Sequence, residues 1–199
     1  MITDLAKSET KFNLMRAFAG ESQARQRYGI AAAFAADEKL YIIQDAFLFT
    51  ADQEQEHGEI FYDFLKPFAG RNLRVDADYP VDLFNTTLEF LRKAQENEMD
   101  EFNSIYRKFG EVAKEEGFED IAEKFFSIAK IEKTHSERFK KFADLIEKNE
   151  LFESKVPTKW LCLKCGNVYT GRSVPDYCPV CHHDRGYYLK NENFLITQD

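Results

Sequence analysis

The stretch TADQEQEHGEIF, residues 50–61, decides the fold of this chain, because it has the composition of a helix but interrupts its own apolar stripe. Spacings of three and four residues place one line of side chains on one helix face: Phe47, Thr50, Glu54, His57, Phe61 and Phe64. A carboxylate turned toward an apolar interior is costly unless it is neutralised or paired. Glu54 and His57 therefore require a partner inside the protein.

A second copy of this pattern lies 78 residues further along the chain, in IEKTHSERFKKF, residues 131–142. Glu132 and His135 take the places of Glu54 and His57, and phenylalanines flank both pairs. The repeat extends over two helical segments and their connection, with further matches at Ala35/Ala113, Glu38/Glu116, Phe47/Phe125, Glu59/Glu137, Phe61/Phe139 and Phe64/Phe142. It predicts two similar helix pairs related by a pseudo-twofold axis.

Helical periodicity predicts four helices, over residues 4–36, 40–66, 82–114 and 118–148. Two short connections and one long middle connection are typical of a four-helix bundle with one crossover. Lys39 falls opposite Gly117 in the repeat. We expect the first turn to differ in shape or to be strained, because lysine disfavours the left-handed conformation that glycine accepts.

Acidic groups also interrupt the core-facing lines of the other two helices. The first helix carries Leu14, Phe18, Glu21, Arg25, Tyr28 and Ala32 on one line, and the third carries Leu91, Ala94, Glu98, Glu101 and Ile105. Several carboxylates and two imidazoles that converge in one bundle need compensating positive charge, which two metal cations supply. This mixture of ligands suits iron or manganese, whereas an all-carboxylate site would suit calcium or magnesium.

The alternative is that these acids lie on solvated helix faces, as a single Glu-x-x-His usually does. Two copies at matched positions, flanked by phenylalanine, favour the inward orientation. Glu96 and Asp100 are neighbouring alternatives in the third helix, but Glu98 and Glu101 share the apolar stripe. Two tyrosines, Tyr28 and Tyr106, could hydrogen-bond to ligating carboxylates, and an incidental position in the core explains them equally well.

The cysteines form a separate motif, CLKCGNVYTGRSVPDYCPVC, in which two Cys-x-x-Cys pairs lie twelve residues apart: Cys162, Cys165, Cys178 and Cys181. This spacing predicts a tetrahedral four-thiolate metal site rather than two disulfides. Zinc and iron both accept four thiolates, so the spacing leaves the metal open. His182 and His183 follow a complete ligand set and are interpreted as surface residues.

Charge and composition limit the classes of function. The net charge is −8, which argues against a surface for nucleic acid or anionic membrane. The first residues lack the apolar segment of a secretory signal, and no apolar run is long enough to span a bilayer. We therefore expect a cytoplasmic protein. No Gly-x-Gly-x-x-Gly fingerprint is present, so any NAD(P)H would be oxidised by a separate protein.

Together, AFAGESQARQRY (17–28), the two Glu-x-x-His motifs, EMDE (98–101) and the cysteine pairs resemble the rubrerythrin family over nearly the whole chain. The resemblance implies a mainly α fold, with a ferritin-like di-iron four-helix bundle (1–149), a linker (150–158) and a small rubredoxin-like β and loop module with a four-cysteine iron site (159–199). It also implies a non-haem di-iron peroxidase that reduces hydrogen peroxide to water in protection against oxidative stress. Implied partners are an external NAD(P)H-dependent reductase or rubredoxin as electron donor, and a second copy in a homodimer or higher homo-oligomer.

The same resemblance assigns roles to individual residues. The implied bundle iron ligands are Glu21, Glu54, His57, Glu98, Glu101, Glu132 and His135, with Tyr28 and Tyr106 beside them. One iron would alternate between His57 and Glu101 as the redox state changes. Lys39, Met99, Asp100 and Arg107 depart from the family pattern at a turn and beside the site. Two other functions stay open: a ferroxidase or iron-handling protein of ferritin type, and a structural zinc ribbon on a helical interaction bundle.

Overall fold

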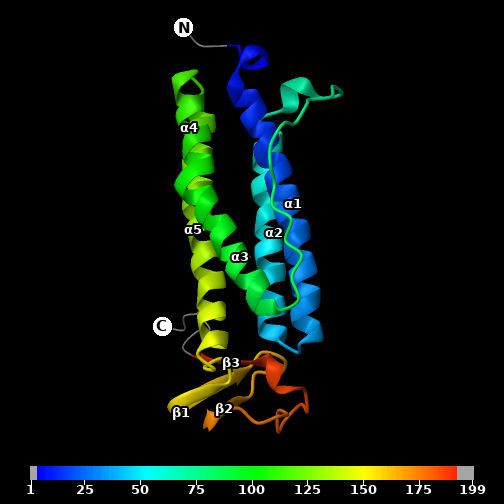
Figure 1. The fold of residues 1–199 in the computed structure, drawn as a ribbon, viewed down its shortest axis with the longest axis vertical. Coiled ribbons are helices and arrows are strands. Elements are labelled where there is room, and N and C mark those ends of the chain that lie inside the picture. The colour runs from blue at the N-terminus through cyan, green and yellow to red at the C-terminus, as the bar shows by residue number, and fades with distance from the viewer. Residues whose placement is uncertain (1–3, 192–199) are drawn as a thin grey trace.

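The computed structural model describes residues 4–191, which form a long helical bundle with a small β-sheet at one end (Figure 1). The helices are α1 (Glu9–Asp37), α2 (Tyr41–Asp63), α3 (Thr87–Asp100), α4 (Tyr106–Glu115) and α5 (Glu119–Glu147). A π-helix, Glu101–Ile105, joins α3 to α4, so that the two continue as one rod. The prediction of a mainly α four-helix bundle followed by a β and loop module is confirmed. Within the described residues, no helix combines the length and apolar character needed to cross a bilayer.

Capping side chains set where two of the helices begin. Ser8 accepts a hydrogen bond from the backbone of Lys11, so α1 begins at residue 9 rather than at the predicted residue 4. The Thr86 side chain accepts from the backbone of Glu89, and the Glu89 carboxylate accepts from the Thr86 hydroxyl at 2.8 Å. This Thr-x-x-Glu pairing starts α3 at residue 87, five residues later than the apolar periodicity predicts.

Two apolar clusters fill the bundle on either side of its middle. One, nearer the sheet, contains Ile43, Phe47 and Phe139; the other, toward the far end, is built around Leu14, Phe61, Phe125 and Ile128. Burial of each such side chain contributes about 1.5–3 kcal/mol. The helical turns that carry Glu21, Glu54, Glu98 and Glu132 lie between these two clusters, which exclude water from both sides.

The two helix pairs are α1 with α2 and the α3–α4 rod with α5. The number of residues between matching positions of the two pairs changes within the α3–α4 rod. Leu14/Leu91 and Glu21/Glu98 are 77 residues apart, whereas Tyr28/Tyr106 are 78 apart. The second pair therefore has one residue more between its acid and its tyrosine. The π-helix accommodates it, because its backbone N–H at Tyr106 reaches back to the carbonyl of Glu101.

The π-helix also changes which side chains face the core. Ile105, which an uninterrupted stripe predicts in the core beside Leu91, is 40% exposed. The wider turn rotates the helix between Glu101 and Tyr106, so that Tyr106 takes the buried position instead. In α1, Arg25 is also exposed against expectation, and Ala24 fills the core position before Tyr28.

The two short turns have the same shape, so the expectation of a different shape at Lys39 is wrong, whereas the alternative expectation of strain is confirmed. Lys39 has φ 58° and Gly117 has φ 89°, both in the left-handed region. The next N–H closes each turn, from Leu40 to Ala35 at 2.7 Å and from Phe118 to Ala113 at 2.8 Å. Lysine thus adopts the conformation that glycine adopts in the other pair, at an energetic cost that glycine avoids.

The long connection from α2 to α3 runs back along α1 (Figure 1). We call residues 76–82 of this connection the strap. Tyr79 donates its hydroxyl hydrogen to the carbonyl of Arg16 at 2.8 Å, and Arg16 Nε donates to the carbonyl of Asp76 at 3.1 Å. Asp82 pairs with Arg27 and accepts from Asn97 at 3.0 Å. These contacts hold the strap against α1 and α3.

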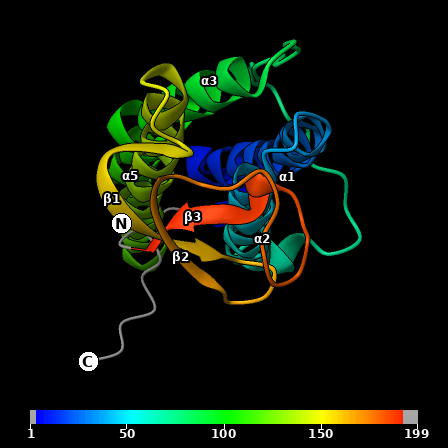
Figure 2. The ribbon, with the colours of Figure 1, turned by 90° about the horizontal axis from the view of Figure 1, so that it is seen from below.

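The C-terminal module is a three-stranded antiparallel sheet in the order β2-β1-β3, built from β1 (Glu153–Cys162), β2 (Val168–Ser173) and β3 (Tyr188–Lys190). It lies across the end of the bundle (Figure 2). The rings of Tyr187 and Tyr41 stack with centroids 4.2 Å apart. Gly186 approaches the carbonyl of Lys39 so closely that a Cβ would lie 1.8 Å from that oxygen. Residues 150–158, expected as a linker, include the first half of β1.

Candidate metal centres

Six side chains from all four rods meet in the middle of the bundle, and each is at most 5% exposed: Glu21, Glu54, His57, Glu98, Glu132 and His135. The Glu-x-x-His spacing places Glu54 with His57 on one face of α2, one turn apart, and α5 does the same with its own pair. We call these six residues the acid cluster. The sequence predicts all six, and the structure brings them together.

The acid cluster divides into two overlapping sets of donors. Glu21, Glu54, His57 and Glu132 form one set, in which the donor atoms lie within 4.8 Å of one another. Glu54, Glu98, Glu132 and His135 form the other, with the same limit. Glu54 and Glu132 belong to both sets. A carboxylate has two oxygens, so these two residues are placed to bridge two neighbouring ions.

The distances inside each set fit a metal ion. His57 Nδ1 lies 3.0 Å from Glu132 Oε1 and 3.2 Å from Glu54 Oε2. His135 Nδ1 lies 2.8 Å from Glu132 Oε2 and 3.0 Å from Glu54 Oε1. Two ligands about 2.1 Å from one ion and at right angles are separated by about 3 Å. The donors are therefore spaced as neighbouring ligands of a common ion would be.

Most of the donor atoms lack a hydrogen-bonding partner among the described residues. The unpartnered buried atoms include both oxygens of Glu132, both ring nitrogens of His135, and one oxygen each of Glu21, Glu54 and Glu98. Each such atom costs about 1–3 kcal/mol when it is left unsatisfied. Metal ions would satisfy these atoms together and offset the negative charge, so the residues present fit a di-metal centre.

Burial raises the pKa values of the carboxylates in the cluster, whereas the imidazoles lower them. Burial raises the pKa of Glu98 to about 7. Burial also acts on Glu54, but the neighbouring imidazoles of His135 and His57 outweigh it and hold the Glu54 pKa at about 2. Against burial, the carboxylates Glu132 and Glu54 raise the pKa of His57 to about 9. Without metal the imidazoles hold protons, which ions must displace, so metal affinity should rise with pH.

Two tyrosines hydrogen-bond to the cluster across the pseudo-twofold axis. Tyr106 donates to Glu21 Oε1 at 2.5 Å, and Tyr28 donates to Glu98 Oε1. Both rings are buried. Each helix pair thus supplies a tyrosine to the acid of the other pair, which orients that carboxylate.

Glu101 differs from the rest of the predicted ligands. It begins the π-helix, is half-buried and belongs to neither donor set. Burial raises its pKa, and the neighbouring Glu98 and Glu132 raise it further. It therefore lies within electrostatic range of the acid cluster without joining it.

Arg138 is a residue beside the cluster that the sequence analysis missed. It lies one turn after His135 and donates to Thr50 Oγ1 at 2.7 Å and to Gln53 Oε1 at 3.0 Å. It thereby ties α5 to α2 just outside Glu54. The signal was present, because Thr50 lies on the same stripe as Glu54 and Arg138 follows His135 at helical spacing.

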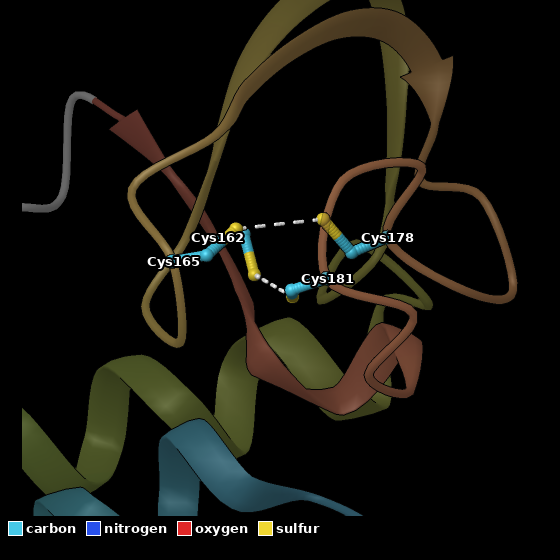
Figure 3. A group of neighbouring side chains, drawn as sticks. All are labelled: Cys162, Cys165, Cys178 and Cys181. Carbon is cyan, nitrogen blue, oxygen red and sulfur yellow. Dashed lines mark hydrogen bonds between the residues drawn. The ribbon is translucent and has the colours of Figure 1, made fainter.

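The four cysteines face one another at the tips of two loops of the sheet module (Figure 3). Their sulfurs are not bonded: Cys162 Sγ lies 3.9 Å from Cys181 Sγ, and Cys165 Sγ lies 3.7 Å from Cys178 Sγ. In a tetrahedron with metal–sulfur bonds of about 2.3 Å, the sulfurs are about 3.8 Å apart. The separations therefore fit one four-thiolate ion, and a disulfide, at about 2.05 Å, is excluded here.

The cysteine environment favours thiolates unevenly. Burial raises the pKa of Cys162 to about 12. At Cys178, burial is outweighed by hydrogen bonds, first from the Tyr188 hydroxyl, and the pKa falls to about 6. Asn167 Nδ2 also lies 3.8 Å from Cys178 Sγ. The cysteine spacing alone does not reveal the Tyr188 and Asn167 contacts. His182 and His183 are exposed, as the sequence indicates.

Comparison with family models gives two matches along the chain. The model described as rubrerythrin matches residues 13–143, and the model described as the rubredoxin-like domain of rubrerythrin matches residues 160–188. The two matches contain the acid cluster and the four cysteines respectively.

Curated relatives are similar over nearly their full length. Rubrerythrin from Clostridium perfringens is 41% identical over 185 residues, which cover 92% of this chain and 95% of the relative. Rubrerythrin from Porphyromonas gingivalis is 39% identical over 181 residues, 91% of this chain and 89% of that one. A solved structure of nigerythrin in its mixed-valence state shares the fold, with a TM-score of 0.62 and 23% identity, over 95% of this chain and 92% of that chain.

Proposed function

This chain belongs to the rubrerythrin family, and we propose that it reduces hydrogen peroxide to water at a di-iron centre in the acid cluster. In this reaction the O–O bond breaks, and two electrons and two protons convert one peroxide into two waters. Two adjacent ferrous ions would supply one electron each. The observation that carries the proposal is the set of unpartnered, buried carboxylate and imidazole atoms shared between two donor sets.

The residues of the chain would hold the ions and manage the protons. Glu54 and Glu132 would bridge, because both belong to both donor sets. Glu21 and His57 would complete one end, and Glu98 and His135 the other. Tyr106 and Tyr28, which hydrogen-bond to Glu21 and Glu98, are placed to keep those carboxylates oriented and to pass protons through them.

Glu101 is the candidate for an exchangeable ligand opposite His57. It stands outside both donor sets, yet its charge acts on the cluster. The wide turn of the π-helix gives its backbone a geometry that the matching turn of α1 lacks. We propose that Glu101 and His57 serve the same metal position in different redox states.

The four-cysteine site would hold one iron and deliver electrons singly. A zinc ion would fit the same sulfurs but could not change its redox state. An external NAD(P)H-dependent reductase or rubredoxin would supply the electrons, and a homodimer or higher homo-oligomer in the cytoplasm is the proposed state. The division into residues 1–149, 150–158 and 159–199 is likewise a proposal.

A ferroxidase or iron-handling function would use the same donor sets, but an attached four-cysteine site gives iron storage no advantage. A structural zinc ribbon on an interaction bundle leaves the buried acids unexplained. Metal analysis with an optical spectrum separates these functions. Iron-loaded protein whose thiolate absorption bleaches with reductant and returns with peroxide supports the peroxidase. Zinc-loaded, colourless protein without peroxide turnover would contradict it.

A double substitution tests the assignment of the site. Glu54→Ala with His57→Ala removes one bridging and one terminal donor, so we expect about half or more of the bundle iron to be lost. Peroxide turnover should disappear, while the iron-thiolate spectrum survives because the cysteines are untouched. The matched control, Glu56→Ala with Glu59→Ala, removes two exposed carboxylates of the same helix and should keep iron and turnover. Retained turnover in the first variant would refute the assignment.

A further inference from the structure

A cavity of about 340 Å³ opens between α1, the strap and the π-helix. Its lining includes Glu101 and Tyr106, so it borders both the half-buried acid and the tyrosine that donates to Glu21. The acid cluster itself is covered above and below by the two apolar clusters. The cavity therefore exposes Glu101 to solvent, and Glu101 lies within electrostatic range of the acid cluster.

Small residues on α1 keep this cavity open. Ala17 and Gly20 are the small residues of α1 in its lining; they lie four residues and one residue before Glu21. A Cβ placed on Gly20 would lie 3.6 Å from Cε1 of Tyr79, so the tyrosine ring stands directly over the glycine. Any larger side chain at residue 20 would project into the space between α1 and the strap.

Tyr79 is held in place on the opposite wall. Its hydroxyl donates to the Arg16 carbonyl at 2.8 Å, and Arg16 in turn holds the strap through Asp76. Burial raises the pKa of Tyr79, Arg16 opposes this shift, and Glu101 adds to it. Tyr79 and Glu101 line the same cavity, so the phenol and the carboxyl group border one space. The ring is thus a fixed wall rather than a free surface side chain.

The remaining lining is polar enough to admit a small polar molecule. Gln23 on α1 and Ser104 on the π-helix border the same hollow as Glu101. Hydrogen peroxide is small and both donates and accepts hydrogen bonds, which these groups can reciprocate. An alkyl hydroperoxide carries an apolar group that must fit beside the Tyr79 ring, which lines the same cavity.

We propose that this cavity is the route by which peroxide reaches the acid cluster, and that the Tyr79 ring limits the size of the peroxide that passes. The proposal rests on the peroxide reduction proposed above. It assigns a specificity-determining role to Tyr79, and an access role to the part of the cavity that Glu101 and Tyr106 line.

Blocking the route tests the first half of the proposal. Ser104→Trp places an indole in the cavity, so we expect kcat/KM for hydrogen peroxide to fall by about tenfold while kcat at saturation changes little. The matched control is Asn103→Trp, an equally exposed neighbour in the same π-helix that does not line the cavity. It should stay within about twofold of the parent protein. Equal effects of the two tryptophans would overturn the route.

Widening the route tests the second half. Tyr79→Ala removes the ring, and we expect kcat/KM for tert-butyl hydroperoxide to rise by about fivefold relative to that for hydrogen peroxide. Tyr79→Phe keeps the ring and removes only the hydrogen bond to Arg16, so its ratio should match that of the parent protein. An unchanged ratio in Tyr79→Ala, or an equal change in Tyr79→Phe, would overturn the role of the ring.

A binding measurement separates this inference from the proposed function. Azide is a small anion that alters the optical spectrum of ferric non-haem centres. Its association rate with iron-loaded protein should fall by about tenfold in Ser104→Trp and stay within about twofold in Asn103→Trp. Slowed azide entry without peroxide turnover in the parent protein would support the route and refute the peroxidase. Peroxide turnover with equal azide rates in all variants would refute the route alone.

Discussion

The first helix pair, α1 with α2, and the second, the α3–α4 rod with α5, present matching side chains to the middle of the bundle on different backbones. Glu21 and Glu98, Glu54 and Glu132, and His57 and His135 correspond in the repeat. The first pair is α-helical throughout, whereas the second contains the π-helix at Glu101–Ile105. The side chains of the acid cluster are therefore related by pseudo-twofold symmetry, although the helices that carry them differ by the π-helix.

The difference between the pairs lies beside the acid cluster, at the turn that carries Glu101. Between Glu21 and Tyr28, the position that corresponds to Glu101 is occupied by Ala24, which is buried and apolar. The additional residue of the second pair widens the turn at Glu101 and opens it to the cavity beneath the strap. One pair thus closes its side of the cluster, and the other leaves an approach.

The largest expected effect comes from removing the asymmetry. Deleting Asn103, an exposed residue of the π-helix, would return the second pair to the spacing of the first. We expect the acid cluster to bind its ions, because its six residues do not depend on the added residue. Turnover of peroxide should fall by about tenfold or more, about 1.4 kcal/mol in the barrier, because Glu101 loses its wide turn.

Asn103→Ala, which keeps the chain length, is the control for that deletion and should retain turnover. Circular dichroism and iron content report whether the bundle is intact. An iron-loaded deletion variant with full turnover would show that the break in symmetry is not needed for the reaction.

A smaller effect is expected at the two short turns, which share one shape but not one residue. Lys39→Gly should raise the free energy of unfolding by about 1 kcal/mol, because glycine accepts φ 58° without strain. Gly117→Lys should lower it by a similar amount, about 1 kcal/mol, for the opposite reason. Chemical denaturation measures both.

Lys39→Ala is the control for the side chain at that turn. It removes the ammonium group that lies 3.7 Å from Asp184 but keeps a Cβ, so it should change stability little. If alanine and glycine stabilised equally, relief of backbone strain would not be the cause.

The smallest expected effect concerns how the pairs cap each other. Glu116 accepts from the backbone N–H groups of Glu9 and Thr10, each at 2.8 Å, whereas its counterpart Glu38 accepts from Thr87 at 3.2 Å. Glu116→Gln leaves one of these donors without an acceptor and should cost about 0.5 kcal/mol, and Glu38→Gln about a third of that.

The Glu116 contribution should depend on pH. Its pKa is lowered from the ordinary value of 4.5, against burial, first by the hydrogen bond from the Thr10 side chain and then by the two backbone N–H groups. A lowered folded-state pKa means that the stabilisation is present above pH 4.5 and is lost as the pH falls through the lowered value. The difference between the parent protein and Glu116→Gln should therefore shrink in acid. A pH-independent difference would exclude charge as its origin.

The sequence by itself determined the parts of this protein that depend on local spacing. Glu-x-x-His places two donors on one helix face whatever surrounds them, and the repeat of that motif implied a second set. The cysteine pairs likewise fixed a four-sulfur site, because their loops are short. The four helices also followed from periodicity, although capping by Ser8 and Thr86 moved two of their starts.

The change of offset from 77 to 78 residues was also present in the sequence and would have predicted an irregular turn between Glu98 and Tyr106. An uninterrupted stripe instead put Ile105 in the core, where the π-helix does not allow it. The change in residue spacing could be recognised only once Tyr28 was known to correspond to Tyr106, and Glu21 to Glu98.

Only the tertiary structure decided which atoms meet. Three features are contacts between distant segments. Glu54 and Glu132 belong to both donor sets, each tyrosine reaches the acid of the other pair, and the Tyr79 ring packs over Gly20 at the wall of a cavity. Such contacts depend on the crossing of the rods and on the path of the strap, and no local pattern encodes them. Helical spacing determines the direction in which a side chain points, whereas tertiary packing determines which groups it contacts.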